Sequence, residues 1–152
     1  MVWRAKVVTE SEAQTLRDIH RQLWEAMEGK KDYSGVYGTL VTLANLVPRF
    51  QKFIGPIANV SAIADLLWGV SQRSNSAANI SAIRGAEKQF EQVRYAIASG
   101  GHRRAEFQMN WITFPSVSTT HEFVQGNNSN PGRGYKILRM QLSNGSWVSY
   151  TN

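Results

Sequence analysis

Apolar and charged residues alternate at the start of the chain. Trp3, Ala5 and Val7 are apolar, and Arg4 and Lys6 stand between them, which is the two-residue period of a half-buried strand. We therefore expect a first strand with Trp3, Ala5 and Val7 on its buried side. This strand is expected to pair with strands from the far end of the chain.

The next pattern has the period of a helix. Thr9 and Glu12 form a capping box, in which each side chain accepts a hydrogen bond from the other residue's backbone N–H. This predicts a helix over about 10–28. Its apolar stripe consists of Leu16, Ile19, Leu23 and Met27.

Residues 33–72 form the least charged segment, with three charged side chains in forty residues. Two apolar arms, over about 34–47 and 57–71, are joined by a short basic corner from Pro48 to Lys52. Pro48 ends or kinks the first arm because it has no amide hydrogen and collides with the preceding turn. We call residues 33–72 the apolar hairpin and expect both arms to be helical.

A fourth helix is expected over about 76–99, where apolar residues recur at helical spacing and charged residues occupy the opposite side. Its apolar stripe consists of Ile80, Ile83, Phe90, Val93 and Ile97.

Strand patterns follow Gly100 and Gly101. Alternation predicts strands over about 106–114 and 121–125, and the Asn144-Gly145 turn predicts a hairpin. The hairpin strands cover 135–142 and 147–151. The loop at 126–134 is rich in Asn, Ser, Pro and Gly, which is typical of mobile irregular chain.

Helices separated from strands along the sequence predict an α+β fold. We expect an N-terminal strand, a four-helix middle that includes the apolar hairpin, and a small antiparallel sheet of about four strands, with the first strand as a candidate fifth. At 152 residues the chain fits a single domain, 1–152. Its helical part covers about 9–100, and its β part covers about 105–152 together with strand 2–8.

The net charge of +6 favours anionic partners such as nucleic acid, anionic lipid or a bacterial envelope. The absence of cysteine excludes a disulfide framework, a Cys-based zinc site and a thiol nucleophile. His20, His102 and His121 lack ligand spacing, and we expect each to be a surface residue. No catalytic motif or carboxylate pair stands out, so we expect a protein that is not an enzyme and that has no catalytic residue, metal or cofactor.

Length argues against a permanent membrane span. The uncharged runs 33–48 and 53–64 have sixteen and twelve residues, below the ~20 residues that a bilayer core requires. The simplest interpretation is therefore that the apolar hairpin forms the buried core of a domain. The more specific hypothesis is a segment that leaves its helical cover and enters a membrane.

On that hypothesis the protein is membrane-active, as a pore-forming, antimicrobial, bacteriocin-like or toxin-like protein. Arg49 and Lys52 would first attract anionic lipid, and Phe50, Phe53 and Trp68 would then insert. In general plan alone the hairpin is similar to that of pore-forming colicins; no motif matches. A secreted location is expected for such a protein, although the chain starts without a signal-peptide pattern.

Two alternatives stay open. One is a phage or envelope structural protein that assembles into a homo-oligomer through the apolar hairpin. The other, ranked third, is a nucleic-acid-binding protein that gathers basic residues around Trp111 or Tyr135. Its basic residues would be Arg103, Arg104, Arg133, Lys136 and Arg139.

Overall fold

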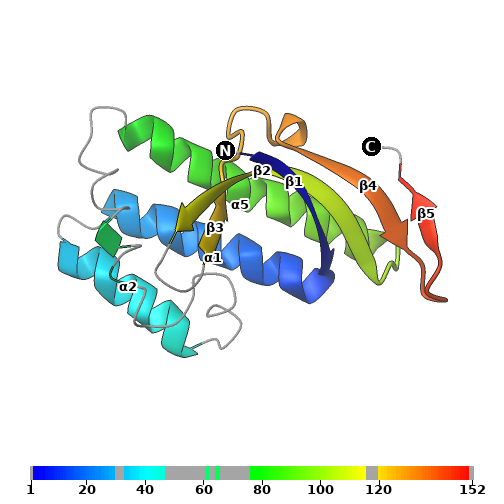
Figure 1. Ribbon diagram of the computed structural model, residues 1–152, viewed down its shortest axis with the longest axis horizontal. Helices are drawn as coiled ribbons and strands as arrows, with labels where there is room; N and C mark the ends of the chain where they lie inside the picture. Colours follow the sequence, from blue (N-terminus) through cyan, green and yellow to red (C-terminus); the bar gives the residue numbers. More distant parts are fainter. Residues whose placement is uncertain are drawn as a thin grey trace.

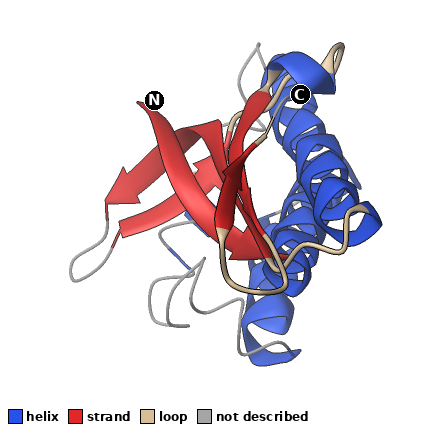
Figure 2. Ribbon diagram, turned by 90° about the vertical axis from the view of Figure 1, so that its right-hand side faces the viewer, coloured by secondary structure: helices blue, strands red, loops and turns tan. Residues whose placement is uncertain are grey.

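The computed structural model describes residues 2–29, 33–46, 61, 64–65, 76–115 and 120–150. A curved sheet forms one layer, and the long helices pack against one side of it as a second layer (Figure 2). In chain order the elements are β1 (Val2–Thr9), α1 (Glu10–Gly29), α2 (Tyr33–Leu46), α5 (Ser76–Ser99), β2 (Arg104–Pro115), β3 (Thr120–Val124), η1 (Pro131–Arg133), β4 (Tyr135–Gln141) and β5 (Trp147–Ser149).

These elements confirm the α+β class and the small antiparallel sheet, which has five strands including the N-terminal one. The four-helix middle is not matched, because the described residues form three α-helices. Most of the expected helix at 57–71 lies outside the described residues. Within it, Ala64 is buried and Ser61 and Asp65 are exposed.

Strand β2, with twelve residues, is the centre of the sheet because other strands pair along both of its edges. One edge pairs with β1 over the full length of β1. The other edge pairs first with β4, up to Met109, and then with β3, from Trp111 onward. Asn110 therefore marks the point at which the two partners of this edge separate.

Helices α1 and α5 run antiparallel behind the sheet (Figure 1). Helix α1 begins as the capping box predicts, since the Thr9 N–H donates to Glu12 Oε1 and the Glu12 N–H donates to Thr9 Oγ1, each at 3.2 Å. The predicted stripe of α1 is buried along its length, as are Ile83, Phe90, Val93 and Ile97 of the α5 stripe. The core joins them to the strands through Leu16, Phe90, Val93, Ile97, Ala105, Phe107, Met109, Trp111, Ile137 and Met140.

We call the helix-covered side of the sheet the inner face and the opposite side the outer face. The strand predicted over 2–8 and its pairing with a distant strand are confirmed, but the side expected to be buried was wrong, because Trp3, Ala5 and Val7 lie on the outer face, with Trp3 54% exposed. The register explains the inversion: Val8 pairs with Ala105 and Lys6 with Phe107, both of which point inward. At this edge the long stem of Lys6 covers the core, and its Nζ lies 4.4 Å from the centre of the Trp111 ring.

His20 is fully buried, so its prediction as a surface residue was also wrong. Its Nε2 accepts the Val124 N–H at 2.9 Å, and its Nδ1 lies 2.7 Å from the Leu16 carbonyl oxygen, which it reaches as a donor. Burial lowers the pKa of His20 from 6.5 to about 4, and the bond to Leu16 opposes part of that shift. His20 is therefore a neutral core residue with both nitrogens satisfied.

Helix α2 packs mainly on α1, with Leu40 fully buried. The helix contains no charged residue. Its fourteen residues give a length of about 21 Å, short of a bilayer core of about 30 Å. In the part of the chain that the structure describes, no helix is long and apolar enough to cross a membrane.

Candidate functional site

The residues proposed for membrane or partner binding lie outside the described part of the chain. These residues are Arg49, Phe50, Lys52, Phe53 and Trp68. The membrane hypothesis therefore stays a prediction, and the candidate site built here comes from other residues.

The described helices leave the outer face of the sheet uncovered (Figure 2). Strand register arranges its side chains in four cross-strand rows. From one end to the other the rows are Arg104, Gln141 and Trp147; then Val7, Glu106, Arg139 and Ser149; then Ala5, Gln108 and Lys136; and last Trp3, Asn110 and Gln125.

One cluster on this face is fixed by mutual contacts. The Arg139 guanidinium donates to both carboxylate oxygens of Glu106, at 3.2 and 3.3 Å. Its carbon Cζ also lies 4.3 Å from the centre of the Trp147 ring. The fork-like pair and the stacked ring hold all three side chains in one arrangement.

Other basic side chains on and around the outer face have no ion pair with any described residue. Arg104 and Lys136 lie on the face, Arg103 lies beside it before β2, and Arg133 lies on η1; all four are exposed. Glu106 is the one acidic side chain in the four rows, and Arg139 already neutralises it. The outer face therefore presents uncompensated positive charge to solvent.

The solvent side of the helices is organised differently. Glu91 accepts hydrogen bonds from Arg94, at 2.6 and 2.9 Å, and from Arg17 on α1. These arginines, Arg94 first, lower the pKa of Glu91 from 4.5 to about 2, against a smaller opposing effect of burial. Arg94 also pairs with Glu10 at 3.1 Å. Within the described part of the chain, charge on the helices is thus largely paired, and the unpaired basic side chains gather on and around the sheet.

The loop from Gln125 to Gly134 leaves the sheet at Asn110 and crosses to α5. Buried Gln89 anchors both its ends: Gln89 Nε2 donates to the Gly134 carbonyl at 3.0 Å, and Gln89 Oε1 accepts the Asn127 N–H at 2.7 Å. Outside η1 the loop is irregular, as predicted, but its backbone is bonded to α5 at Gly126, Asn127 and Gly134.

Two glycines let the loop reach α5. A Cβ on Gly126 would lie 2.2 Å from the Ala86 nitrogen, and a Cβ on Gly85 would lie 2.5 Å from the Asn128 nitrogen. Both contacts are with backbone, which has little room to shift, so each position needs glycine. The Gly126 N–H donates to the Ala82 carbonyl at 2.8 Å across this contact.

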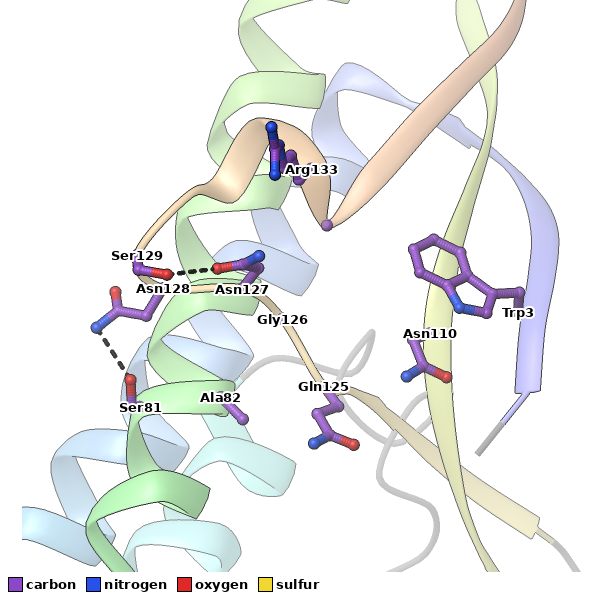
Figure 3. Close-up of a pocket in the computed structure, with 11 residues that line it drawn as sticks. Trp3, Ser81, Ala82, Asn110, Gln125, Gly126, Asn127, Asn128, Ser129 and Arg133 are labelled. Carbon is purple, nitrogen blue, oxygen red and sulfur yellow. Dashed lines mark hydrogen bonds between the residues drawn. The ribbon is translucent and has the colours of Figure 1, made fainter.

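A pocket of about 480 Å³ opens where the loop separates from the sheet. Figure 3 shows Trp3 and Asn110 on one side of this pocket, the loop and Arg133 on the other, and Gln125 between them. The Trp3 ring extends from β1 toward the loop (Figure 3). Most of the other lining groups are amides or hydroxyls, so the pocket suits a ligand with polar edges and one flat apolar face.

The structure brings together only part of the basic surface proposed from sequence. Arg104, Lys136 and Arg139 do share the outer face. The aromatic members were wrong, because Trp111 is 2% exposed and Tyr135 is directed to the inner face. Trp3 and Trp147 take their place. The position of Trp147 opposite Gln141 in the predicted hairpin could have indicated that its ring lies on this face. Trp3 was missed because the prediction placed its side chain on the buried side of the first strand.

No family model, curated protein or solved structure matches this chain. Among the described residues, no group of three or more His, Asp or Glu side chains is arranged to hold a metal ion. The functional argument therefore depends on the geometry of the outer face.

Proposed function

We propose that the protein is a non-enzymatic binding protein that holds single-stranded nucleic acid on the outer face of its sheet. The observation that supports this most is the combination of unpaired basic side chains with the exposed Trp3 ring and the half-buried Trp147 ring on a face that no described helix covers. Basic groups attract the phosphates, and flat rings stack on bases whatever their sequence.

A single strand fits this face better than a duplex. Bases stack on protein side chains only when they are free of their partner strand, and Trp3 is 54% exposed on an open sheet. The rows from Arg104 to Asn110 cover seven residues of β2, or about 20 Å from first to last, which accommodates a short stretch of strand. Neutral oligosaccharides would also use Trp and amides, but they would have no use for the positive charge.

The test is fluorescence anisotropy with a labelled homopolymeric oligonucleotide of about eight residues, single-stranded or annealed. At low salt, the wild-type protein should bind the single-stranded oligonucleotide more tightly than the annealed duplex. The double variant Arg104→Gln, Lys136→Gln should reduce the slope of log K against log salt by about 1.4, since each lost single-strand contact contributes about 0.7.

Lys88→Gln is the matched control, because Lys88 is an exposed lysine on α5, away from the outer face. It should leave the slope unchanged. Failure to bind any single strand at low salt would refute the proposal, as would equal binding of the duplex.

A second candidate is the membrane-active function, favoured by the uncharged helix α2 at the start of the apolar hairpin. Dye leakage from anionic but not zwitterionic vesicles is its expected result, and Phe50→Ala with Phe53→Ala should reduce lipid binding more than stability. Absence of leakage at any pH would rule it out. The alternative of a phage or envelope assembly protein predicts a stable oligomer without lipid binding, which sedimentation would detect.

A further inference from the structure

We propose that the pocket beside Trp3 is a nucleotide subsite at the end of the outer face. In it, Trp3 stacks on one base, the Gln125 amide bonds to the edge of that base, and Arg133 pairs with the adjoining phosphate. This inference rests on the proposed function and adds to it one position at which the protein distinguishes between the bases of the bound nucleic acid.

The pocket exists because the two partners of one β2 edge separate at Asn110. Strand β4 pairs up to Met109 and β3 begins at Trp111, so the chain between them leaves the plane of the sheet. The Gln125 N–H donates to the Asn110 carbonyl at 2.9 Å, which holds Gln125 in the same outer row as Trp3. Asn110 therefore lies between Trp3 and Gln125, and an aromatic ring and two amides line this side of the pocket mouth (Figure 3).

Trp3 supplies the apolar wall. It lies opposite Asn110 on the edge strand, and its large exposed fraction means that a base can stack on it without displacing core residues. Stacking on aromatic side chains tolerates any base, because every base has a flat π-face. The indole is thus suited to hold a base in place while other groups identify it.

Gln125 supplies the polar reading group. Its side-chain amide has no hydrogen-bond partner among the described residues. An amide offers a donor and an acceptor in one plane, which is the pattern that matches a base edge in bidentate contact. We therefore expect the subsite to prefer one base over the others.

Arg133 supplies the cation on the opposite wall. It is exposed, and no described residue forms an ion pair with it. Its position is fixed through η1, which lies within the loop that Gln89 bonds at both ends. A side chain on a backbone that is already held in place loses less conformational freedom when it binds a phosphate than a side chain on a mobile loop does.

The size of the pocket agrees with this occupant. Its 480 Å³ falls within the range of about 300–1,000 Å³ typical of small-molecule sites. A free phosphate would use Arg133 alone and leave Trp3 and Gln125 without a role. The combination of a ring, an amide and a cation is what a nucleotide unit requires.

The test uses the four labelled DNA homopolymers and the corresponding RNA homopolymers, each of about eight residues, in the anisotropy assay. Trp3→Ala should weaken binding of every oligomer about tenfold, and Trp3→Phe should restore most of the loss. Tyr95→Ala is the matched control, since Tyr95 is an exposed aromatic residue on α5, and it should change nothing.

Two different measurements distinguish the role of Gln125 from that of Arg133. Gln125→Leu should reduce the differences in affinity between bases to less than about threefold while leaving the salt slope unchanged. Arg133→Gln should weaken all oligomers alike and reduce the salt slope by about 0.7. Preference for RNA over DNA would indicate a contact to the ribose hydroxyl in the same pocket.

The outcomes distinguish the two levels of the proposal. Absence of single-strand binding by the wild-type protein would refute both. A further outcome is that mutations of Arg104 and Lys136 weaken binding while mutations of the three subsite residues, Trp3, Gln125 and Arg133, do not. That result would refute the subsite proposal and would still support binding by the outer face. Loss of binding in Trp3→Ala that Trp3→Phe does not rescue would overturn stacking as the role of Trp3.

Discussion

Trp3 and Trp111 lie on neighbouring strands of one sheet, and they belong to opposite faces. Trp111 is 2% exposed, packs against Phe90 and Phe107, and lies under Lys6. Trp3 is 54% exposed at the mouth of a polar pocket. The inner face buries apolar rings to hold the helices, whereas the outer face keeps rings, amides and unpaired charge in contact with water. Stability and binding should therefore respond to different sets of mutations.

The largest effect is expected on the inner face. Trp111→Ala should lower the free energy of unfolding by about 3–5 kcal/mol, because it removes a large buried ring and leaves a cavity. Urea unfolding measures the change. Trp111→Phe, with a smaller loss, serves if the alanine variant does not fold. A loss below about 1 kcal/mol for the alanine variant would contradict the assignment of Trp111 to the core.

Gln89 bonds the loop from Gln125 to Gly134 to helix α5, and its replacement should have the next largest effect on stability. Gln89→Leu leaves the Gly134 carbonyl and the Asn127 N–H without partners, which should cost about 2–4 kcal/mol. The same variant should weaken oligonucleotide binding because the loop loses its anchor. Gln92→Leu is the matched control, since Gln92 is exposed on the same helix. Equal stability of the two variants would contradict the anchoring role of Gln89.

The buried imidazole predicts a dependence of stability on pH. The pKa of His20 is about 4 in the folded protein and 6.5 in the unfolded chain, so the unfolded chain binds the proton first as the pH falls. Stability is full above pH 6.5 and is lost progressively toward pH 4. At about 1.4 kcal/mol per pKa unit, roughly 2 kcal/mol should be lost between pH 7 and pH 5.

Urea unfolding at the two pH values tests this dependence. His20→Gln should be less stable than wild type at pH 7, but its stability should change much less between pH 7 and pH 5. If the variant keeps the full pH dependence, groups other than His20 cause it.

The smallest effect on stability is expected at Trp3. Trp3→Ala should change the free energy of unfolding by less than about 0.5 kcal/mol, since the ring is mostly in solvent, while it reduces oligonucleotide affinity. This result would complete the contrast with Trp111. A loss of stability comparable to that of Trp111→Ala would mean that the outer face is also a packing surface.

Local patterns predicted most of the inner face. The Thr9 and Glu12 capping box, the stripes of α1 and α5, and the alternation of Phe107, Met109 and Trp111 all specify burial through their own spacing. The Asn-Gly hairpin was likewise visible, because its turn needs positive φ, which Gly145 has at 91°. In these elements the neighbours along the chain decide which side is buried.

The outer face was harder to predict because partners distant in sequence create it. Alternation in β1 shows two sides but not which one meets the core, and the register with β2 chose the side of Arg4 and Lys6. The loop at 126–134 has the composition of mobile chain. Its anchor, Gln89, shares a helix side with the small residues Ala82 and Gly85, a spacing that could have indicated a close backbone approach.

The most direct test of binding by the outer face is an NMR titration of the labelled protein with a short single-stranded oligonucleotide. We predict salt-sensitive shifts of backbone amides in β1, β2 and β4 and in the loop from Gln125 to Gly134, with little change on the solvent side of α1. Shifts confined to the helices, or none at low salt, would contradict the account.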